Sequence, residues 1–260
     1  MAHTALITGA SSGIGAQFAH RLAREGFNLV VVARRHDRLA QLREQLGTAA
    51  VSVEILAADL ATQAGLDTVL ERVSVGDIHT AVLSAGVAGY GGFTERPLDE
   101  ISANWMLNAT GPFMLTRALL PSMIEQGEGS VILIASALAF SAGMTQEYMP
   151  KRAAYVAAKA ALVGLGRTLN AETQGTGVRV TAVCPGMVAT EWNQGASQGP
   201  RSMSADDVVS AALVANGNDE AVCLPGCNDP EILDALAEQE STLVRENNVP
   251  ELATRFRTER

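Results

Sequence analysis

Tyr155 and Lys159 form the pair whose chemistry is easiest to derive from the sequence. They are four residues apart in a stretch, 154–172, whose pattern predicts a helix, so their side chains share one face. A free phenol has a pKa of about 10 and is a poor proton donor near neutrality. A neighbouring ammonium stabilises the phenolate and lowers that pKa. The pair is therefore a candidate for proton transfer, although the same spacing also occurs on helices that have no catalytic role.

Glycines cluster where the first predicted strand meets the first predicted helix. The cluster comprises Thr8, Gly9, Ala10, Ser11, Ser12, Gly13, Ile14 and Gly15. Glycine lets the backbone turn tightly and approach a pyrophosphate without a Cβ clash. The helix that follows presents free N–H groups and the positive end of its dipole to phosphates. We therefore expect nucleotide binding at Gly9, Ser11, Ser12, Gly13, Ile14 and Gly15.

Two arginines follow the second predicted strand. An acidic residue at the end of this strand would accept hydrogen bonds from the adenosine ribose of NAD. The chain has Ala33 there, and Arg34 and Arg35 come next. A guanidinium binds a 2′-phosphate through charge-assisted, forked hydrogen bonds. We therefore expect NADP(H), bound by Arg34 first and by Arg35 second.

Short β-rich runs alternate with longer helical patterns along the whole chain. The predicted strands are 5–8, 28–33, 51–57, 80–84, 130–135, 179–184 and 220–224. The predicted helices are 14–25, 37–46, 63–73, 97–125, 154–172 and 205–214, with shorter helical patterns at 230–239 and 250–257. The strand-like runs are almost entirely apolar, as expected for parallel strands covered on both faces. The alternation predicts a doubly wound, Rossmann-like α/β fold of about seven strands. We expect one domain over 1–260, with 228–260 as a helical tail.

Composition excludes several classes of partner. The formal net charge is −9 and no dense basic block is present, which argues against nucleic-acid binding. No apolar run approaches the roughly 18 residues of a membrane span, so the cytoplasm is the expected location. The spacing of Cys184, Cys223 and Cys227 suggests neither a disulfide framework nor a metal site.

The pattern T-G-x-x-x-G-x-G from Thr8 to Gly15, with Y-x-x-x-K at Tyr155, resembles the short-chain dehydrogenase/reductase family from about residue 4 to residue 226. The resemblance implies that NADPH supplies hydride while Tyr155 gives a proton to a carbonyl oxygen. It also implies that Lys159 bonds the nicotinamide ribose, and adds two catalytic residues, Ser136 and Asn108. Ser136 would polarise the carbonyl, and Asn108 would hold the water of a proton relay.

The same resemblance implies the remaining cofactor contacts. They are Asp59 and Leu60 at the adenine, Ala85 and Gly86 along the adenosine, and Pro185, Gly186, Val188 and Thr190 at the nicotinamide. The chain departs from the family at Leu83 and Ser84, where two asparagines usually brace the sheet. That departure puts the local architecture in question more than the chemistry.

The assignment of the serine has a rival. Ser136 is 19 residues before Tyr155, several more than the family usually shows, whereas Ser141 is 14 before it. Ser136 is preferred because it ends a predicted strand, as the family's serine does. The additional residues then belong to a loop that shapes the substrate pocket, together with 89–94 and 187–203. In that loop, Tyr148 is interpreted as a pocket or surface residue.

These features predict reversible, NADPH-dependent reduction of a ketone or aldehyde. The alternatives are an alcohol dehydrogenase acting in the oxidative direction, a 3-oxoacyl thioester reductase and a non-catalytic dinucleotide sensor. A thioester reductase would need a basic patch for its carrier protein, and a sensor would not need the proton donor. The resemblance also implies a homodimer or homotetramer built on the long helices. The expected ligand is a small carbonyl compound or alcohol, and no metal.

Overall fold

The computed structural model describes residues 2–47, 50–144, 149–191, 200–229 and 231–257. The chain divides into two compact units, Met1–Pro225 and Gly226–Arg260, which are described separately.

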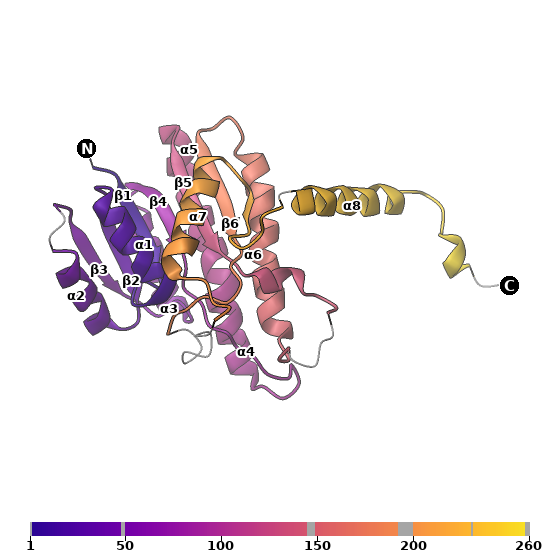
Figure 1. Ribbon diagram of the computed structural model, residues 1–260, viewed down its shortest axis with the longest axis horizontal. Helices are drawn as coiled ribbons and strands as arrows, with labels where there is room; N and C mark the ends of the chain where they lie inside the picture. The colour runs from indigo at the N-terminus through magenta and orange to yellow at the C-terminus, as the bar shows by residue number, and fades with distance from the viewer. Residues whose placement is uncertain (1, 48–49, 145–148, 192–199, 230, 258–260) are drawn as a thin grey trace. The chain divides into compact units, whose positions relative to one another are not determined.

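Within the described residues of the first unit, seven strands form one sheet in the order β3-β2-β1-β4-β5-β6-β7 (Figure 1). Every neighbouring pair is parallel. The strands are β1 Thr4–Thr8, β2 Asn28–Ala33, β3 Val53–Ala57, β4 Ile78–Leu83, β5 Gly129–Ile134, β6 Val178–Val183 and β7 Val222–Cys223. The predicted doubly wound sheet is confirmed, with strand ends displaced by no more than two residues. The order reverses between β1 and β4, where such folds open a crevice at the carboxyl ends.

Helices cover both faces of the sheet (Figure 1). They are α1 Gly13–Arg24, α2 His36–Gln45, α3 Gln63–Val73, α4 Leu98–Trp105, α5 Gly111–Gln126, α6 Ala153–Glu172 and α7 Ala205–Gly217, with a 3₁₀ turn at Ala137–Phe140. Alternate strand residues serve the two layers. Ile7 packs with Phe18 of α1 and Val208 of α7, whereas Leu6 packs with Leu66 of α3 and with Leu115 of α5. This is why the strands are apolar on both faces.

The helix predicted over 97–125 is not continuous. Residues Met106–Thr110 form a π-helical segment between α4 and α5. Such a segment contains one residue more than the α-helical repeat requires, and sequence periodicity does not reveal it. Asn108 lies at its centre. The prediction of one long α-helix is corrected accordingly.

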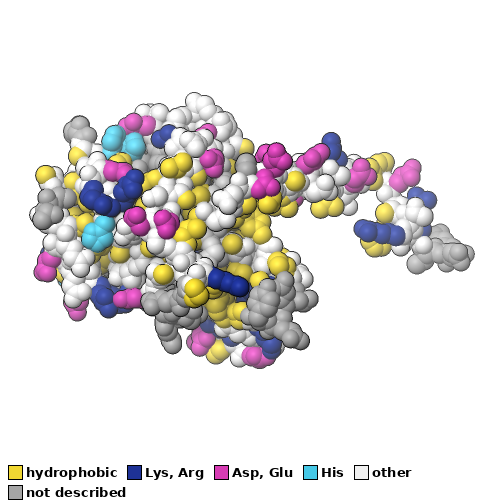
Figure 2. All heavy atoms as spheres, viewed as in Figure 1, with side chains coloured by type: hydrophobic (Ala, Val, Ile, Leu, Met, Phe, Trp, Pro, Cys, Tyr) yellow, Lys and Arg dark blue, Asp and Glu magenta, His cyan; other side chains and the backbone are white. Residues whose placement is uncertain are grey.

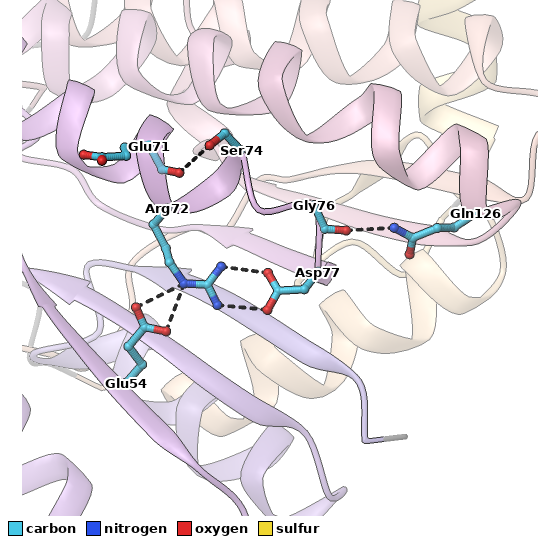
Figure 3. A network of polar contacts seen from close by, with 7 residues as sticks. All are labelled: Glu54, Glu71, Arg72, Ser74, Gly76, Asp77 and Gln126. Carbon is cyan, nitrogen blue, oxygen red and sulfur yellow. Dashed lines mark hydrogen bonds and ion pairs between the residues drawn. The ribbon is translucent and has the colours of Figure 1, made fainter.

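Arg72 of α3 joins three elements near the start of β4 (Figure 3). Its guanidinium donates two hydrogen bonds to Asp77, of 2.7 and 3.0 Å, and its Nε donates to Glu54 of β3 at 2.9 Å. Gln126 at the end of α5 donates to the Gly76 carbonyl at 2.8 Å. Because the Arg72 side chain is only 17% exposed, its forked pair with Asp77 is partly shielded from water.

The second unit contains α8, Glu231–Asn247, and a short 3₁₀ turn at Thr254–Phe256. Both predicted tail elements need correction. The helix predicted over 230–239 extends eight residues further, to Asn247, and its predicted first residue, Pro230, lies outside the described residues. The helix predicted over 250–257 is only the 3₁₀ turn. No described residue of α8 is buried. Across the described part of the chain, no helix is both long and apolar enough to cross a membrane.

Candidate active site

A cavity of about 670 Å³ lies at the carboxyl ends of the strands. Ligand pockets of proteins commonly fall in this size range. Nearly every residue singled out from the sequence lines it: Gly9, Ser11, Ser12, Gly13, Ile14, Arg34, Arg35, Asp59, Leu60, Ala85, Gly86, Asn108, Ser136, Tyr155, Lys159, Pro185, Gly186, Val188 and Thr190. Gly15 does not line it.

The glycine turn after β1 is held in a shape that larger residues cannot adopt. Gly9 has φ +70°, and a Cβ there would lie 2.9 Å from the Ala85 Cα. A Cβ at Gly15 would lie 2.5 Å from the Gly9 carbonyl oxygen. Gly15 therefore allows α1 to pack against the turn, and this steric role explains its absence from the cavity wall.

The start of α1 is open to an anion. Ser12 is its N-cap residue, but the Ser12 hydroxyl makes no capping hydrogen bond to the helix. The first N–H groups of an α-helix have no partner within the helix, and they favour negative charge. The first turn of α1 carries no acidic residue. The turn and the helix together form a cradle suited to a phosphate.

The two arginines differ in their contacts. Arg35 donates to the hydroxyls of Ser11 at 3.0 Å and Ser12 at 3.2 Å, so its guanidinium lies against the glycine turn. Arg34 lies 4.0 Å from Asp59, and its side chain is 63% exposed. Both line the cavity, but Arg35 is the one fixed beside the phosphate cradle. Its guanidinium also lies 3.9 Å from Glu191, which belongs to the wall predicted over 187–203.

Tyr155 lies near the start of α6 with 5% of its surface exposed, and the Ser136 hydroxyl hydrogen-bonds its phenol. Burial raises the pKa of Tyr155, and the bond to Ser136 opposes that rise in part. This differs from the lowering expected from Lys159. The reason is that burial disfavours the charged phenolate more strongly than its surroundings favour it. The phenol therefore keeps its proton at neutral pH.

Lys159 lies one turn after Tyr155 on α6 and is also buried. Its ammonium donates a 2.8 Å hydrogen bond to the Ile134 carbonyl at the end of β5 and lies 5.8 Å from the centre of the Tyr155 ring. Burial lowers the pKa of Lys159 to about 8. The side chain can therefore gain and lose a proton close to neutral pH, as a proton relay requires.

Asn108 is fully buried in the π-helical segment. Its amide nitrogen donates to the carbonyls of Val87 and Asn104, both at 3.1 Å, while its oxygen accepts from the Val87 N–H at 3.3 Å. A Cβ on Gly86 would lie 2.8 Å from that oxygen and 3.4 Å from the Lys159 Nζ. Gly86 thus leaves the space between Asn108 and Lys159 open.

The two candidate serines occupy different surroundings. Ser136 follows β5 and lines the cavity beside Tyr155. The Ser141 hydroxyl donates to the Leu138 carbonyl at 2.7 Å and accepts from Arg152 at 3.1 Å, and it does not line the cavity. Ser141 therefore fixes the loop, which leaves Ser136 as the serine next to the phenol.

The predicted substrate walls are described only in part. Leu138, Met149, Pro150 and Met187 line the cavity, whereas Tyr148 and 192–199 lie outside the described residues. The expected wall at 89–94 contributes Tyr90, whose ring meets that of Tyr155 at 77° with centroids 5.6 Å apart. Nothing in the sequence pattern distinguished Tyr90 from its neighbours.

The segment predicted to hold the nicotinamide follows β6. The Pro185 carbonyl accepts a 2.9 Å hydrogen bond from the Ala137 N–H, which ties this segment to the residue after Ser136. Val188 pairs with Met203 in a parallel bridge. Thr190 is buried, and a Cβ on Gly13 would lie 3.2 Å from its Cβ. The two ends of the predicted cofactor site therefore meet in one cavity.

Comparisons with known proteins agree with the fold described above. The family model described as short chain dehydrogenase matches residues 3–201. The structure of a short-chain dehydrogenase from Sphingobium yanoikuyae in complex with NADPH is 35% identical, covers 98% of this chain and 100% of that one, and has a TM-score of 0.90. The bulky-bulky ketone specific alcohol dehydrogenase from Comamonas testosteroni is 32% identical, with 98% of each chain covered and a TM-score of 0.88.

A curated relative is also a dehydrogenase. The 1-deoxy-11-beta-hydroxypentalenate dehydrogenase of Streptomyces avermitilis is 34% identical over 83% of this chain and 82% of its own length. Taken with the family match and the cavity that gathers the predicted residues, these similarities show that the chain belongs to the short-chain dehydrogenase family of oxidoreductases.

Proposed function

We propose that this protein reduces the carbonyl group of a ketone or aldehyde to an alcohol, reversibly, with NADPH as the reductant. The observation that carries the proposal is the buried Tyr155 at one end of a cavity. Its phenol keeps its proton and is hydrogen-bonded to Ser136, and Lys159 lies close to its ring. The other end of this cavity is the glycine turn with two arginines.

The residues present fit NADPH. The turn at Gly9 is a cradle that a Cβ would fill, and α1 begins there without a side-chain cap. Arg35 and Arg34 would hold the 2′-phosphate, with Asp59 and Leu60 at the adenine. Ala85 and Gly86 would pack along the adenosine, and Pro185, Gly186, Val188 and Thr190 would hold the nicotinamide. The structures of relatives with NADPH, and with 5-hydroxy-NADP at 27% identity, support this cofactor.

When bound, the nicotinamide supplies hydride to the carbonyl carbon. Tyr155 gives its phenolic proton to the carbonyl oxygen, while the Ser136 hydroxyl donates a hydrogen bond to the same oxygen and stabilises its developing charge. Lys159 returns a proton toward Tyr155, because its pKa of about 8 leaves it mostly protonated near neutrality. Asn108 would hold the water of the proton relay, next to the space that Gly86 leaves open. Oxidation of an alcohol reverses these transfers.

The walls favour an apolar substrate. Leu138, Met149, Pro150, Met187 and Tyr90 surround the space next to Tyr155. The relative from Comamonas testosteroni is specific for bulky-bulky ketones, and a ketone with two large substituents suits such walls. We therefore favour bulky ketones over small aldehydes. Alcohol oxidation and 3-oxoacyl thioester reduction are the alternatives that a substrate panel distinguishes.

The direct test combines a panel of ketones, aldehydes and thioesters with NADPH or NADH, followed by cofactor absorbance. We expect turnover of bulky ketones with NADPH. Tyr155→Phe should lower kcat by a factor of about 10² to 10⁴ while NADPH binding, measured by fluorescence, is unchanged. Unchanged turnover in that variant would contradict the mechanism. A chain that binds NADPH and turns over no member of the panel would favour a dinucleotide sensor.

Cofactor choice is tested at the arginines. Arg35→Ala should raise the KM for NADPH about 10- to 100-fold, since a charged hydrogen-bonding group is removed. Arg34→Ala should have a smaller effect, because Arg34 is more exposed. Arg38→Ala is the matched control, because Arg38 also pairs with Glu191, at 3.6 Å, yet does not line the cavity. If Arg35→Ala and Arg34→Ala changed the KM for NADH as much as the KM for NADPH, recognition of the 2′-phosphate by these arginines would be excluded.

We further propose a homodimer or homotetramer through α5 and α6, acting in the cytoplasm as one catalytic domain with 228–260 as its tail. Phe113, Met114 and Ile124 on α5 are exposed hydrophobic residues that such an interface would cover. Light scattering of the purified protein gives the oligomeric state directly, and a monomer at micromolar concentration would contradict the proposal.

A further inference from the structure

Two histidines and a glutamate meet at the amino ends of the strands, whereas the cavity lies at their carboxyl ends. His3 directly precedes β1, His79 is the second residue of β4, and Glu128 directly precedes β5. These three strands are neighbours in the sheet. Figure 2 shows histidine side chains beside acidic ones on this part of the surface, near the N-terminus. Carbonyl chemistry at the carboxyl ends of the strands makes no use of these residues.

The side chains converge on one point. His79 Nε2 lies 3.6 Å from one Glu128 carboxylate oxygen, and His3 Nδ1 lies 4.0 Å from the other. The two imidazole rings lie 3.9 Å apart between centroids. One potential ligand atom from each residue lies within 4.8 Å of the other two. Zinc–ligand bonds of about 2.0–2.2 Å would need only a modest contraction of this triangle.

The backbone at His79 departs from regular pairing. Thr4 of β1 pairs with Ile78, but Ala5 pairs with Thr80, so His79 is an extra residue in β4. A bulge of this kind changes the direction of a side chain and leaves the extra residue without a paired residue on the neighbouring strand. Bulges are common beside functional sites. Here the bulge accompanies the placement of the His79 ring between β1 and β5.

The hydrogen bonding of His79 leaves one nitrogen for a ligand. His79 Nδ1 lies 3.2 Å from the Thr80 hydroxyl. An Nδ1–H donated to that oxygen leaves the lone pair of Nε2 directed toward the Glu128 side, an arrangement typical of metal-bound histidine.

We propose that His3, His79 and Glu128 bind one divalent transition-metal ion, with Zn²⁺ the ion best suited to two imidazoles and one carboxylate. Water would complete a four-coordinate site. Mg²⁺ and Ca²⁺ prefer oxygen ligands and do not suit this set. The ion would cross-link the starts of β1, β4 and β5. Its effect is on stability, and it is independent of carbonyl reduction.

The experiment is a thermal melt of metal-stripped, full-length protein without a histidine tag, in a Cys227→Ser background. The serine removes an exposed thiol that could bind Zn²⁺ on its own. At a Zn²⁺ concentration of about 100 times Kd, Tm should rise by roughly 5 °C, and Mg²⁺ should leave it unchanged. Calorimetric titration should give one ion per chain. The melt needs no substrate, so it is independent of whether carbonyl reduction is observed.

Three variants assign the ligands. Glu128→Gln changes an exposed side chain and should fold normally, yet it should lower the Zn²⁺ affinity at least tenfold, as should His79→Gln and His3→Gln. His36→Gln removes an exposed histidine elsewhere and should retain the full shift. The proposal is overturned if Zn²⁺ gives no shift, or if Glu128→Gln retains it. Loss of binding in His3→Gln alone would also overturn it, since the ion would then be held at the start of the chain.

Discussion

The rings of Tyr90 and Tyr155 meet nearly at right angles, with their centroids 5.6 Å apart and their planes at 77°. Tyr90 comes from the loop after β4, whereas Tyr155 belongs to α6. The contact therefore connects the loop after β4 to the proposed proton donor across the cavity.

Removing this contact should impair catalysis without removing the proton donor. An edge-to-face aromatic pair is worth about 0.5–1.5 kcal/mol, so Tyr90→Ala should lower kcat/KM about 2- to 10-fold. Tyr90→Phe keeps the ring and should remain close to the unsubstituted enzyme. Steady-state kinetics on one bulky ketone gives both values. An equally large loss in the Phe variant would assign the effect to the Tyr90 hydroxyl instead.

Gly86 should tolerate no side chain. A Cβ there would lie 2.8 Å from the Asn108 oxygen and 3.4 Å from the Lys159 Nζ, so Gly86→Ala should displace one of them. We expect turnover to fall at least tenfold while the far-ultraviolet circular dichroism is unchanged. The control is Gly217→Ala at the end of α7, where a Cβ meets nothing within 4 Å and which lies outside the proposed interface. That variant should keep full activity, with stability unchanged or slightly raised.

The pH profile of reduction should follow Lys159. Its pKa is lowered to about 8 by burial, so its ammonium, present at lower pH, is lost as the pH rises through 8. Tyr155, whose pKa is raised, keeps its proton over that range. We therefore expect kcat/KM for reduction to be flat below about pH 7 and to fall above about pH 8. A profile that stays flat to pH 10 would exclude Lys159 as the proton source.

Arg72 should contribute to stability and to its pH dependence. Arg72→Met leaves Asp77 and Glu54 without their shared partner, and we expect a loss of about 1–2 kcal/mol, or roughly 3–5 °C in Tm. Arg21→Met is the control, because the Arg21–Glu25 pair on α1 is more exposed, and Tm should not change. Thermal melts of both variants provide the comparison.

The sign of the acid dependence follows from Asp77. The hydrogen bonds from Arg72 lower the pKa of Asp77 below 3.8. The stabilisation is therefore present above the unfolded pKa and is lost as the pH falls through the lower, folded pKa. Below about pH 4 the unsubstituted protein should lose Tm more steeply than Arg72→Met. Parallel pH curves would show that the pair adds no stability.

Local spacing explains what could be predicted from the sequence. Tyr155 and Lys159 share a face because any helix places residues four apart together, and the apolar strand runs predicted the sheet correctly. The roles of the individual site residues stay predictions, although the structure gathers them in one cavity. The preference for Ser136 over Ser141 came from the resemblance to the family, whose serine also ends this strand, and the structure places Ser136 beside the phenol.

Long-range packing explains the rest. The raised pKa of Tyr155 comes from burial beneath segments distant in the sequence, which no local pattern encodes. Arg35, and not Arg34, contacts the serines of the glycine turn because of side-chain direction after β2. The orientation of Tyr90 depends on a loop that crosses to α6.

The π-helical segment at Met106–Thr110 separates two helices that would otherwise be in phase. Leu115, Leu119 and Met123 of α5 keep a strict four-residue spacing in the core. A single-residue deletion in the segment would restore one unbroken helix and rotate everything before it by about 100° relative to α5. The core contacts of α5 could then stay in place while Asn104, which lies beside Gly89, turned away from the loop after β4. The extra residue thus allows the orientation of α5 in the core and that of α4 beside this loop to be set independently.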